Sequence, residues 1–306
     1  MPHRQRPRRG SLQFYPRKRA ARIYSKVSIF HGTEEKPLAF AGWKAGMTHV
    51  KFTEPNSKSP SHGKAVAKAV TIIDTPPLLV CGARFYAGRR AIGEKWMDNL
   101  PKDIQGKTGR QLGKVVEGAE DVRLIVATQS QNSSMKRGTE VFEIGVGGKN
   151  KTAVATSLIG KQISAKDVFA NGEKIIVSSV TKGHGFTGPV KRFGIRIQTR
   201  KDKQMNRHPG SLGSESPGNV DPRTPMAGQY GYFNRTEKNK RIFLISNDVA
   251  KIAPNGGFLN YGAVKGDYML VEGSVPGPKK RLVILRKSDG KTSPVELSYI
   301  STESKQ

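Results

Sequence analysis

Two glycine-lysine runs of the 306-residue chain could in principle hold a nucleotide phosphate. A P-loop places a glycine five residues before the glycine of its Gly-Lys-Ser/Thr end, so that backbone N–H groups can surround the phosphates. Pro101 occupies that position for the GKT run that starts at Gly106. Glu143 occupies it for the run that ends in Gly148 and Lys149, where Asn150 also replaces the required Ser or Thr. The sequence therefore predicts no P-loop.

A third glycine run, from Gly185 to Gly188, matches the G-x-x-G loop of KH-type RNA-binding domains. That loop lies between two helices, whereas residues 189–197 begin with a proline and are expected to be extended, which argues against a KH domain. Catalytic groupings are missing as well. Cys81 is the single cysteine and the six histidines form no i, i+4 pair, while zinc sites need about four N or S ligands. We expect no enzyme, no metal site, no cofactor and no small-molecule substrate.

The charge of the chain points to a polyanionic partner. Fifty-three Lys and Arg face 24 Asp and Glu, which gives a formal charge of +29. A compact monomer would repel itself at this charge. No run approaches the roughly 20 apolar residues of a membrane span, and the basic N-terminus lacks the apolar core of a signal peptide. We therefore expect a cytoplasmic protein that binds nucleic acid and no membrane.

The N-terminal 26 residues hold nine Lys and Arg and no acid, with Phe14, Tyr15 and Tyr24 among them. A solvated tail is the plain alternative. The interleaved aromatic rings favour a tail that lies in RNA grooves and stacks on bases. The residues predicted to bind RNA here are Arg4, Arg6, Arg8, Arg9, Arg17, Lys18, Arg19 and Arg22.

A long stretch from about residue 183 to 239 has almost no periodicity. Its first part, residues 182–201, carries six Lys and Arg and no acid, and glycines recur throughout. A flexible linker would not alternate arginine with large apolar residues in this way, so we predict a finger that folds on RNA. If half of the fifteen cations in the two acid-free segments neutralise phosphates, log K falls with log salt at a slope of around −6. The residues predicted to bind RNA here are Lys182, His184, Lys191, Arg192, Arg196, Arg200, Lys201, Arg207, His208, Arg223, Gln229, Arg235 and Lys240.

Short apolar, β-branched runs bounded by Gly and Pro predict strands, and residues 156–172 have the apolar spacing of a helix with a glycine just past its end. The predicted fold is mainly β with an α+β insertion: a barrel or sandwich made from both halves of the chain, from which two excursions leave. Strands are predicted at 26–30, 48–52, 65–74, 78–87, 121–129, 174–183, 241–246, 267–277 and 281–287. The predicted segments are a basic extension (1–25), a first barrel part (26–91), an inserted α/β subdomain (92–172), a strand and Gly-rich loop (173–190), a finger (191–235), a second barrel part (236–300) and a polar tail (301–306).

Several motifs resemble one known family. The runs TKGHGFTGPVKRFG, NRHPGSLG, PMAGQYGYFNRT and KNKRI, together with PRRGSLQFYPRKRA and AGWKAGMTH near the start, look like universal ribosomal protein L3. They occur in the family's order and span most of the chain. The extended N-terminus and the NRTEKNKRI run resemble the archaeal and eukaryotic branch, and the short C-terminus favours the archaeal one.

The resemblance implies a translation-factor-like β-barrel with long irregular extensions that penetrate RNA. It implies binding to large-subunit rRNA early in subunit assembly, beside neighbouring large-subunit proteins, with Mg²⁺ present only as part of the rRNA. The central finger would reach toward the peptidyl transferase centre, where Glu215 stands in place of the Trp typical of archaeal and eukaryotic relatives. The expected fingertip residues are Ser211, Gly213, Ser214, Glu215 and Ser216. A DNA-binding or chromatin protein and an RNA-modifying or nucleolytic enzyme are the alternatives, and no helix-turn-helix, zinc finger or basic zipper supports the former.

Overall fold

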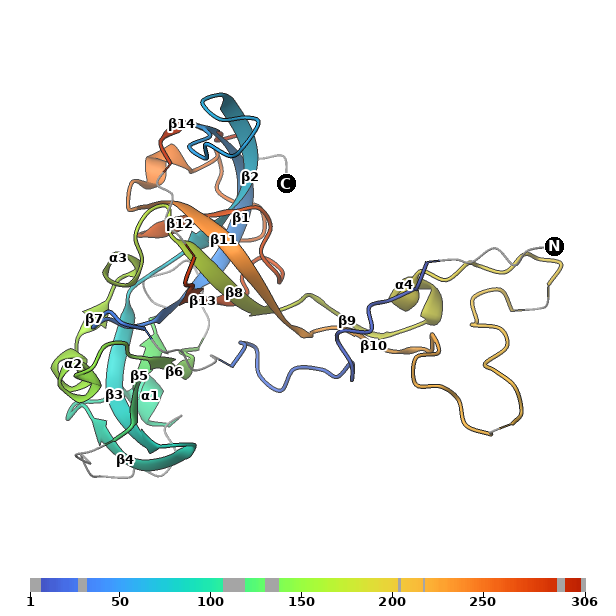
Figure 1. Cartoon of the computed structure of the whole chain (residues 1–306), viewed down its shortest axis with the longest axis horizontal. Coiled ribbons are helices and arrows are strands. Elements are labelled where there is room, and N and C mark those ends of the chain that lie inside the picture. The colour runs from blue at the N-terminus through green and yellow to red at the C-terminus, as the bar shows by residue number, and fades with distance from the viewer. Residues whose placement is uncertain are drawn as a thin grey trace. The chain divides into compact units, whose positions relative to one another are not determined.

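The computed structural model describes residues 7–26, 32–106, 119–129, 138–202, 205–216, 218–290 and 295–303 (Figure 1). The chain divides into two compact units. We call residues 1–21 and 181–234 the arm, and residues 22–180 and 235–306 the body. Residues in strands far outnumber residues in helices, which confirms a mainly β fold. None of the helices in these ranges is long and apolar enough to cross a membrane.

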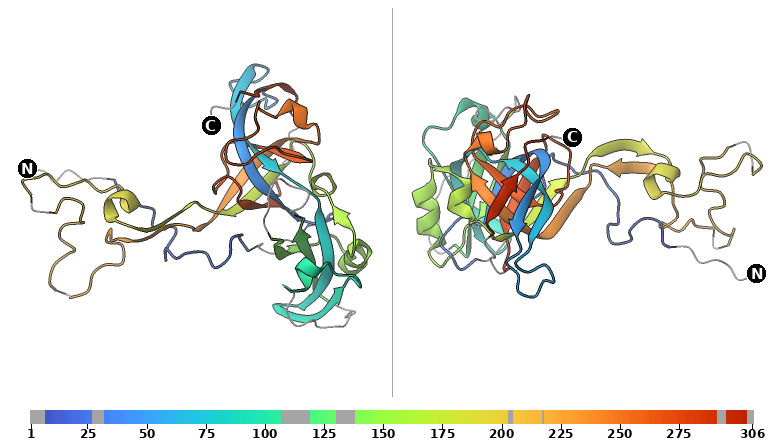
Figure 2. Two further views of the ribbon diagram at one scale, coloured as in Figure 1. Left: turned by 180° about the vertical axis from the view of Figure 1, so that it is seen from behind. Right: turned by 90° about the horizontal axis from the view of Figure 1, so that it is seen from above.

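The larger sheet of the body combines strands from both halves of the chain. Its order is β13-β8-β11-β12-β2-β1-β14, and β13 also pairs with β1, so the path of paired strands returns on itself. Figure 2 shows these strands gathered around one centre. The strands are β1 (Ala39–Thr53), β2 (Ala65–Asp74), β8 (Lys174–Val180), β11 (Asn234–Ser246), β12 (Tyr268–Glu272), β13 (Leu282–Lys287) and β14 (Leu297–Ile300).

Strand β1 allows the sheet to return on itself because it pairs with different strands along its length. Residues 39–43 pair with β13, whereas residues 50–52 pair with β14, and the register against β2 shifts between Lys44 and Gly46. Such a bulge bends a strand and increases its twist. At Gly42 an added Cβ would lie 2.7 Å from the carbonyl oxygen of Asp74, so only glycine permits this close approach of the two strands.

A second sheet of five strands carries the remaining regular structure of the body. Its order is β4-β3-β5-β6, and β7 pairs with β3. Aromatic and aliphatic side chains of both sheets form one continuous buried core. The elements are β3 (Leu78–Ala87), β4 (Arg90–Trp96), β5 (Asp121–Thr128), β6 (Val141–Gly145), β7 (Gln162–Ile163), α1 (Lys102–Gln105), α2 (Lys151–Leu158), α3 (Ala165–Val168) and the short 3₁₀ helix η2 (Val249–Lys251).

The structure corrects the sequence prediction at two places in this region. Strand β3 pairs with β4 and β5, so the boundary predicted between residues 91 and 92 falls inside the second sheet; the change of sheet occurs at Pro76 and Pro77. The single helix predicted over residues 156–172 is wrong as well. Gly160, with φ of 80°, follows α2, and Ser164 begins α3 by a capping box with Asp167. The strand predicted at 26–30 lies largely outside the described residues.

The arm contains little regular structure. It has a two-stranded ribbon, β9 (Gly183–Thr187) with β10 (Gly228–Gly231), and one short helix, α4 (Pro189–Phe193). The extended conformation predicted from Pro189 onward is wrong, because proline at the first helical position loses no hydrogen bond and has a φ that suits a helix. Gly194, with φ of 63°, ends the helix. Across the described part of residues 195–227 no helix or strand forms, as the missing periodicity predicted.

Candidate RNA-binding surface

The ribbon of the arm gives the surrounding irregular segments a fixed frame. Its strands pair at Gly228 with Thr187 and at Gln229 with Phe186, and a bulge follows before Gly231. Gly231 has φ of 69°, and a Cβ there would lie 2.0 Å from the carbonyl oxygen of Lys182. Glycine at this position therefore lets the two backbones meet.

The N-terminal segment is attached to residues outside the two ribbon strands, between Gly194 and Tyr232, through its backbone and its arginines. Ala20 N–H donates to Tyr232 O at 2.8 Å. Arg8 donates to the carbonyl of Arg223 at 2.9 Å, and Arg9 donates to the carbonyl of Gly194. Two stretches separated by about 170 residues in sequence are thus joined by backbone acceptors, which depend little on side-chain identity.

Arg192 is the centre of the second set of contacts. Its Nε donates to Gln229 O at 3.0 Å, and its Nη1 donates to Met226 O at 2.8 Å. Burial lowers the pKa of Arg192, and the charge of Arg17 lowers it further. The guanidinium of Arg17 lies 4.5 Å from the ring centroid of Phe193, and that of Arg192 lies 5.1 Å from it, so one buried ring carries two cations.

Arg8, Arg9, Arg17 and Arg192, all predicted to bind RNA, therefore serve first as scaffold. Arg17 completes the set by donating to Ser11 O at 3.1 Å. A cavity of about 340 Å³ beside Phe193 is lined by the same segments, among them Tyr15, Arg17 and Pro222. Donors directed at protein carbonyls are used for folding the arm, which leaves fewer of them for phosphates.

A second group of predicted residues presents charge outward. None of these side chains has a carboxylate within 4.0 Å among the described residues of the arm. Unpaired exposed cations are free to neutralise phosphates. The group comprises Lys18, Arg19, Lys182, Lys191, Arg196, Arg200, Lys201 and Arg207, all exposed.

The other predicted polar residues of the arm have varied surroundings. His184 stacks on Tyr230 with ring centroids 4.9 Å apart, and Gln229 Nε2 donates to Gly231 O at 3.0 Å. His208 Nδ1 accepts from Gly210 N–H at 3.1 Å. The expected fingertip residues Ser211, Gly213, Ser214, Glu215 and Ser216 are all exposed.

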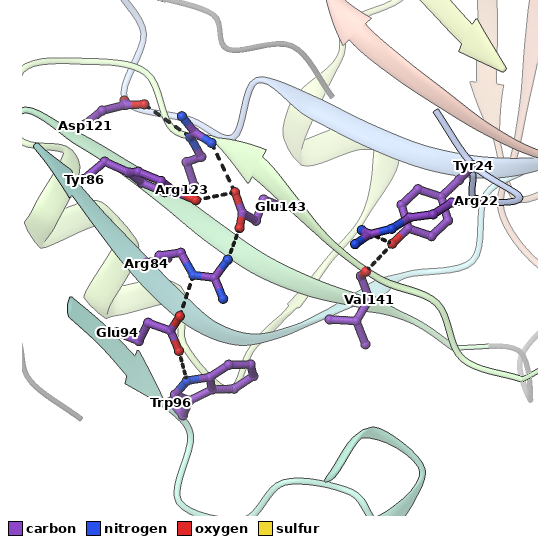
Figure 3. Close-up of polar contacts among 10 residues, drawn as sticks. All are labelled: Arg22, Tyr24, Arg84, Tyr86, Glu94, Trp96, Asp121, Arg123, Val141 and Glu143. Carbon is purple, nitrogen blue, oxygen red and sulfur yellow. Dashed lines mark hydrogen bonds and ion pairs between the residues drawn. The ribbon is translucent and has the colours of Figure 1, made fainter. Parts of the chain in front are cut away.

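Three predicted residues belong to the body rather than the arm. Arg22 donates to the hydroxyl of Tyr24 at 3.1 Å, Lys240 forms an ion pair with Glu237 at 2.9 Å, and Arg235 is half-buried in β11. Tyr24 cannot stack on a base as predicted, because its ring is buried in the core and its hydroxyl donates to Val141 O at 2.8 Å (Figure 3). The predicted residues Arg4 and Arg6 lie outside the described residues.

The sequence prediction did not select Phe186, although it lies within the run GHGFT of β9. Its side chain is 82% exposed, more than any other large apolar residue of the described chain. On the ribbon, a cavity of about 660 Å³ is lined by Gly183, Gly185, Gln229, Tyr232 and residues 19–21. The ring-bearing residues that follow the glycines at 183–186 were the available signal.

In the body, unlike the arm, cationic side chains form ion pairs with acids. On the second sheet, Arg84 Nε lies 2.5 Å from Glu94, and the same guanidinium reaches Glu143 (Figure 3). Glu143 also contacts Arg123 at 3.2 Å and accepts from Tyr86 at 2.8 Å. Every acid of this network has a partner, so the network is suited to holding strands together rather than to binding an anion.

The body also contains a buried acid without a cation. Asp74 is 1% exposed and accepts from the hydroxyl of Tyr261 at 2.5 Å. Burial raises the pKa of Asp74 to about 6. Among the described residues, no group of three or more His, Cys, Asp or Glu is placed to hold a metal ion. Asp74 is therefore an isolated group of the core and not part of a metal cluster.

Comparison with known proteins identifies the family. The sequence profile of ribosomal protein L3 matches residues 1–114 and 102–306. Large ribosomal subunit protein uL3 of Methanococcus aeolicus is 44% identical over 328 aligned positions, which cover 99% of this chain and 98% of the relative. The uL3 proteins of Methanopyrus kandleri and Methanocaldococcus jannaschii are 42% and 41% identical, over 98% of this chain and 91% and 98% of their own lengths. The resemblance seen in the motifs is confirmed: the chain belongs to the ribosomal protein L3 family, in its archaeal form, and this is a family of ribosomal structural proteins, not of enzymes.

Proposed function

We propose that the chain is a structural constituent of the large ribosomal subunit and binds 23S-type rRNA through its arm. The observation that supports this is the unpaired state of the arm's outward cations. Eight exposed Lys and Arg of the arm have no carboxylate within 4.0 Å among the described residues, whereas all fourteen such contacts lie in the body. A dense anionic scaffold such as folded rRNA would neutralise them and release counterions.

The body and the arm have separate tasks in this proposal. The returning ring of strands in the body is the translation-factor-like barrel that the resemblance implies, and it docks early on rRNA in the cytoplasm, beside neighbouring large-subunit proteins. The arm then orders fully among RNA helices. Fixing a backbone costs about 1–2 kcal/mol per residue. The internal contacts of Arg17 and Arg192 hold part of the arm in place before RNA binds. They therefore reduce the cost in conformational entropy that RNA binding must offset.

Binding itself can be tested by filter binding at several salt concentrations. The full chain should bind an in vitro transcript of the large-subunit rRNA more tightly than duplex DNA at matched salt, with a steep salt dependence. Changing Lys182, Lys191, Arg200 and Lys201 together to Gln should reduce the slope of log K against log salt by about 3 to 4, at about 0.7 to 0.9 per phosphate contact. Equal affinity for both nucleic acids, or a slope unchanged in the variant, would contradict the proposal.

The proposed role of the finger, support of the peptidyl transferase region, needs a test in cells. Residues 196–225 would be replaced by a flexible Gly-Ser linker, which keeps Met226 as an acceptor for Arg192. We expect the variant to enter large subunits whose maturation or tRNA accommodation is impaired, measured by gradient sedimentation and translation rate. Lys251→Gln is the control, because it changes an exposed residue of the body and leaves the finger intact. Normal subunit profiles and normal growth with the shortened finger would contradict this role.

A further inference from the structure

Phe186 occupies an unusual position for an apolar aromatic residue. It is the last residue but one of β9 and pairs with Gln229, so its backbone is fixed, and yet its side chain is 82% exposed. Single exposed apolar residues are common on protein surfaces. A rigidly presented aromatic ring differs from them, because its orientation is set by the strand and little conformational entropy is lost when a partner covers it.

The other rings of the ribbon lie on the opposite face from Phe186. A bulge separates Phe186 from His184, because Gly185 has φ of 67° and the two residues His184 and Gly185 lie opposite the single residue Tyr230. The ring of His184 stacks on Tyr230 from the neighbouring strand at 4.9 Å and an interplanar angle of 24°. Phe186 pairs with Gln229, whose side chain lies on the opposite face of β10 from Tyr230. Phe186 is therefore not part of this stacked pair and has no ring contact of its own among the described residues.

The charge around this face selects the kind of partner. Residues 182–201 contain six Lys and Arg and no acid, and Lys182 and Lys191 near the ribbon are exposed. A partner must then combine negative charge with a flat apolar face. An unpaired nucleotide has both, because its phosphate is anionic and every base has a π-face; a base inside a duplex already stacks on its neighbours.

We propose that Phe186 stacks on an unpaired RNA base. The inference rests on the proposed rRNA binding and adds the part of the RNA that is recognised: a bulged, looped or splayed nucleotide rather than a regular helix. The cations beside the ribbon hold the flanking phosphates. Stacking supplies a salt-independent contribution, since no counterion is released by a neutral ring.

The test uses the full chain with Phe186→Leu and Phe186→Trp. The probe is an in vitro transcript of the large-subunit rRNA at one fixed salt concentration and over a salt series. We expect Phe186→Leu to weaken binding by about fivefold to 100-fold, the usual range for losing one stacked base, with an unchanged salt slope. Phe186→Trp should bind within about threefold of the unchanged protein, because the indole also stacks. Tyr299→Leu, which removes an exposed ring from the body, is the matched control and should have no effect.

The outcomes separate this inference from the proposed function. If the unchanged protein fails to bind the transcript, the proposed function fails. If it binds and Phe186→Leu binds equally well, or if Phe186→Trp is as weak as Phe186→Leu, only the stacking inference is overturned. Ultraviolet crosslinking within assembled subunits adds an independent readout. A nucleotide adduct on the peptide that contains Phe186, at a position that chemical probing finds unpaired in free rRNA, supports the inference; a crosslink to a paired nucleotide or to another protein overturns it.

Discussion

The arm and the body use the same basic residue types for different purposes. The arm has sixteen Lys and Arg against three acids in 75 residues, whereas the body has 37 against 21 in 231. With acids nearby, the body places cations such as Arg84 and Arg123 in ion-pair networks between strands. With few acids, the arm directs some arginines at its own carbonyls and leaves others of the described residues, such as Arg200, without a carboxylate within 4.0 Å. The local supply of carboxylates thus decides whether a cation stabilises the fold or remains available for a polyanion.

The two regions also differ in what holds them together. The body has a continuous core across two sheets, in which Phe40, Phe85 and Tyr268 are fully buried. The arm buries Phe193 and Phe233, and neither is part of that core. Its cohesion depends on arginine-to-carbonyl hydrogen bonds, each of which contributes about 1.5 to 3 kcal/mol at most. Perturbations of the arm should therefore change its order and its binding, and perturbations of the body should change global stability.

The same substitution in both regions gives the largest expected contrast. Arg84→Met leaves Glu94, whose side chain is 3% exposed, without its cation, so the free energy of unfolding should fall by about 4 kcal/mol. Arg200→Met in the arm should change it by less than about 0.5 kcal/mol. Urea unfolding measures both. In RNA binding the order reverses: Arg200→Met should reduce the salt slope by about 1, and Arg84→Met should leave it unchanged. Equal effects of the two variants in either assay would contradict the proposed difference between the cations of the arm and those of the body.

The pH dependence of stability should reveal Asp74 in the body. Its folded pKa of about 6 lies above the ordinary value of 3.8, because burial disfavours the carboxylate. The folded state therefore binds the proton more strongly, and the associated stability is full below pH 4 and is lost as the pH rises through 6. As the pH rises from 4 to 7, the free energy of unfolding of Asp74→Asn should increase by about 3 kcal/mol relative to that of the unchanged protein. Thermal unfolding across this range measures it, and parallel curves for the two proteins would exclude the effect.

Arg192→Lys tests how the arm is held together. A lysine cannot donate to Gln229 O and Met226 O in the geometry of the planar guanidinium, nor lie flat against Phe193. Amide hydrogen exchange of the arm should accelerate by about tenfold to 30-fold, or about 1.4 to 2 kcal/mol, while exchange in the body stays the same. Lys191→Gln on the same helix is the control, since Lys191 is exposed. Acceleration in both units, or in neither, would contradict the proposed division.

The smallest effect is expected for an exposed ion pair of the body. Lys251 lies 3.1 Å from Asp248, and the two side chains are 67% and 44% exposed. Solvent screens such a pair, so Lys251→Gln should change the free energy of unfolding by less than about 0.5 kcal/mol. A loss above about 1 kcal/mol in urea unfolding would show that exposed pairs of the body matter as much as its half-buried network.

The sequence by itself determined several of the strands and the family. The strands predicted at 65–74 and 78–87 are β2 and β3 with the same bounds, because each is a short β-branched or aromatic run limited by Gly, Pro or a polar segment. The family resemblance was also available from the motifs alone. The other segment boundaries, the individual RNA contacts and the lack of a cofactor stay predictions.

Only the tertiary structure decided which partner each element and each arginine would have. The prediction assigned β3 to the wrong sheet because strand pairing is made across long sequence separations and leaves no local pattern. It treated Arg17 and Arg192 as free cations because a carbonyl acceptor is present at every residue and has no sequence signature. Burial removed Tyr24 from the predicted stacking residues, and exposure made Phe186 a candidate in its place. Composition determines how much charge and how many rings the chain has, and the fold decides which of them remain uncovered.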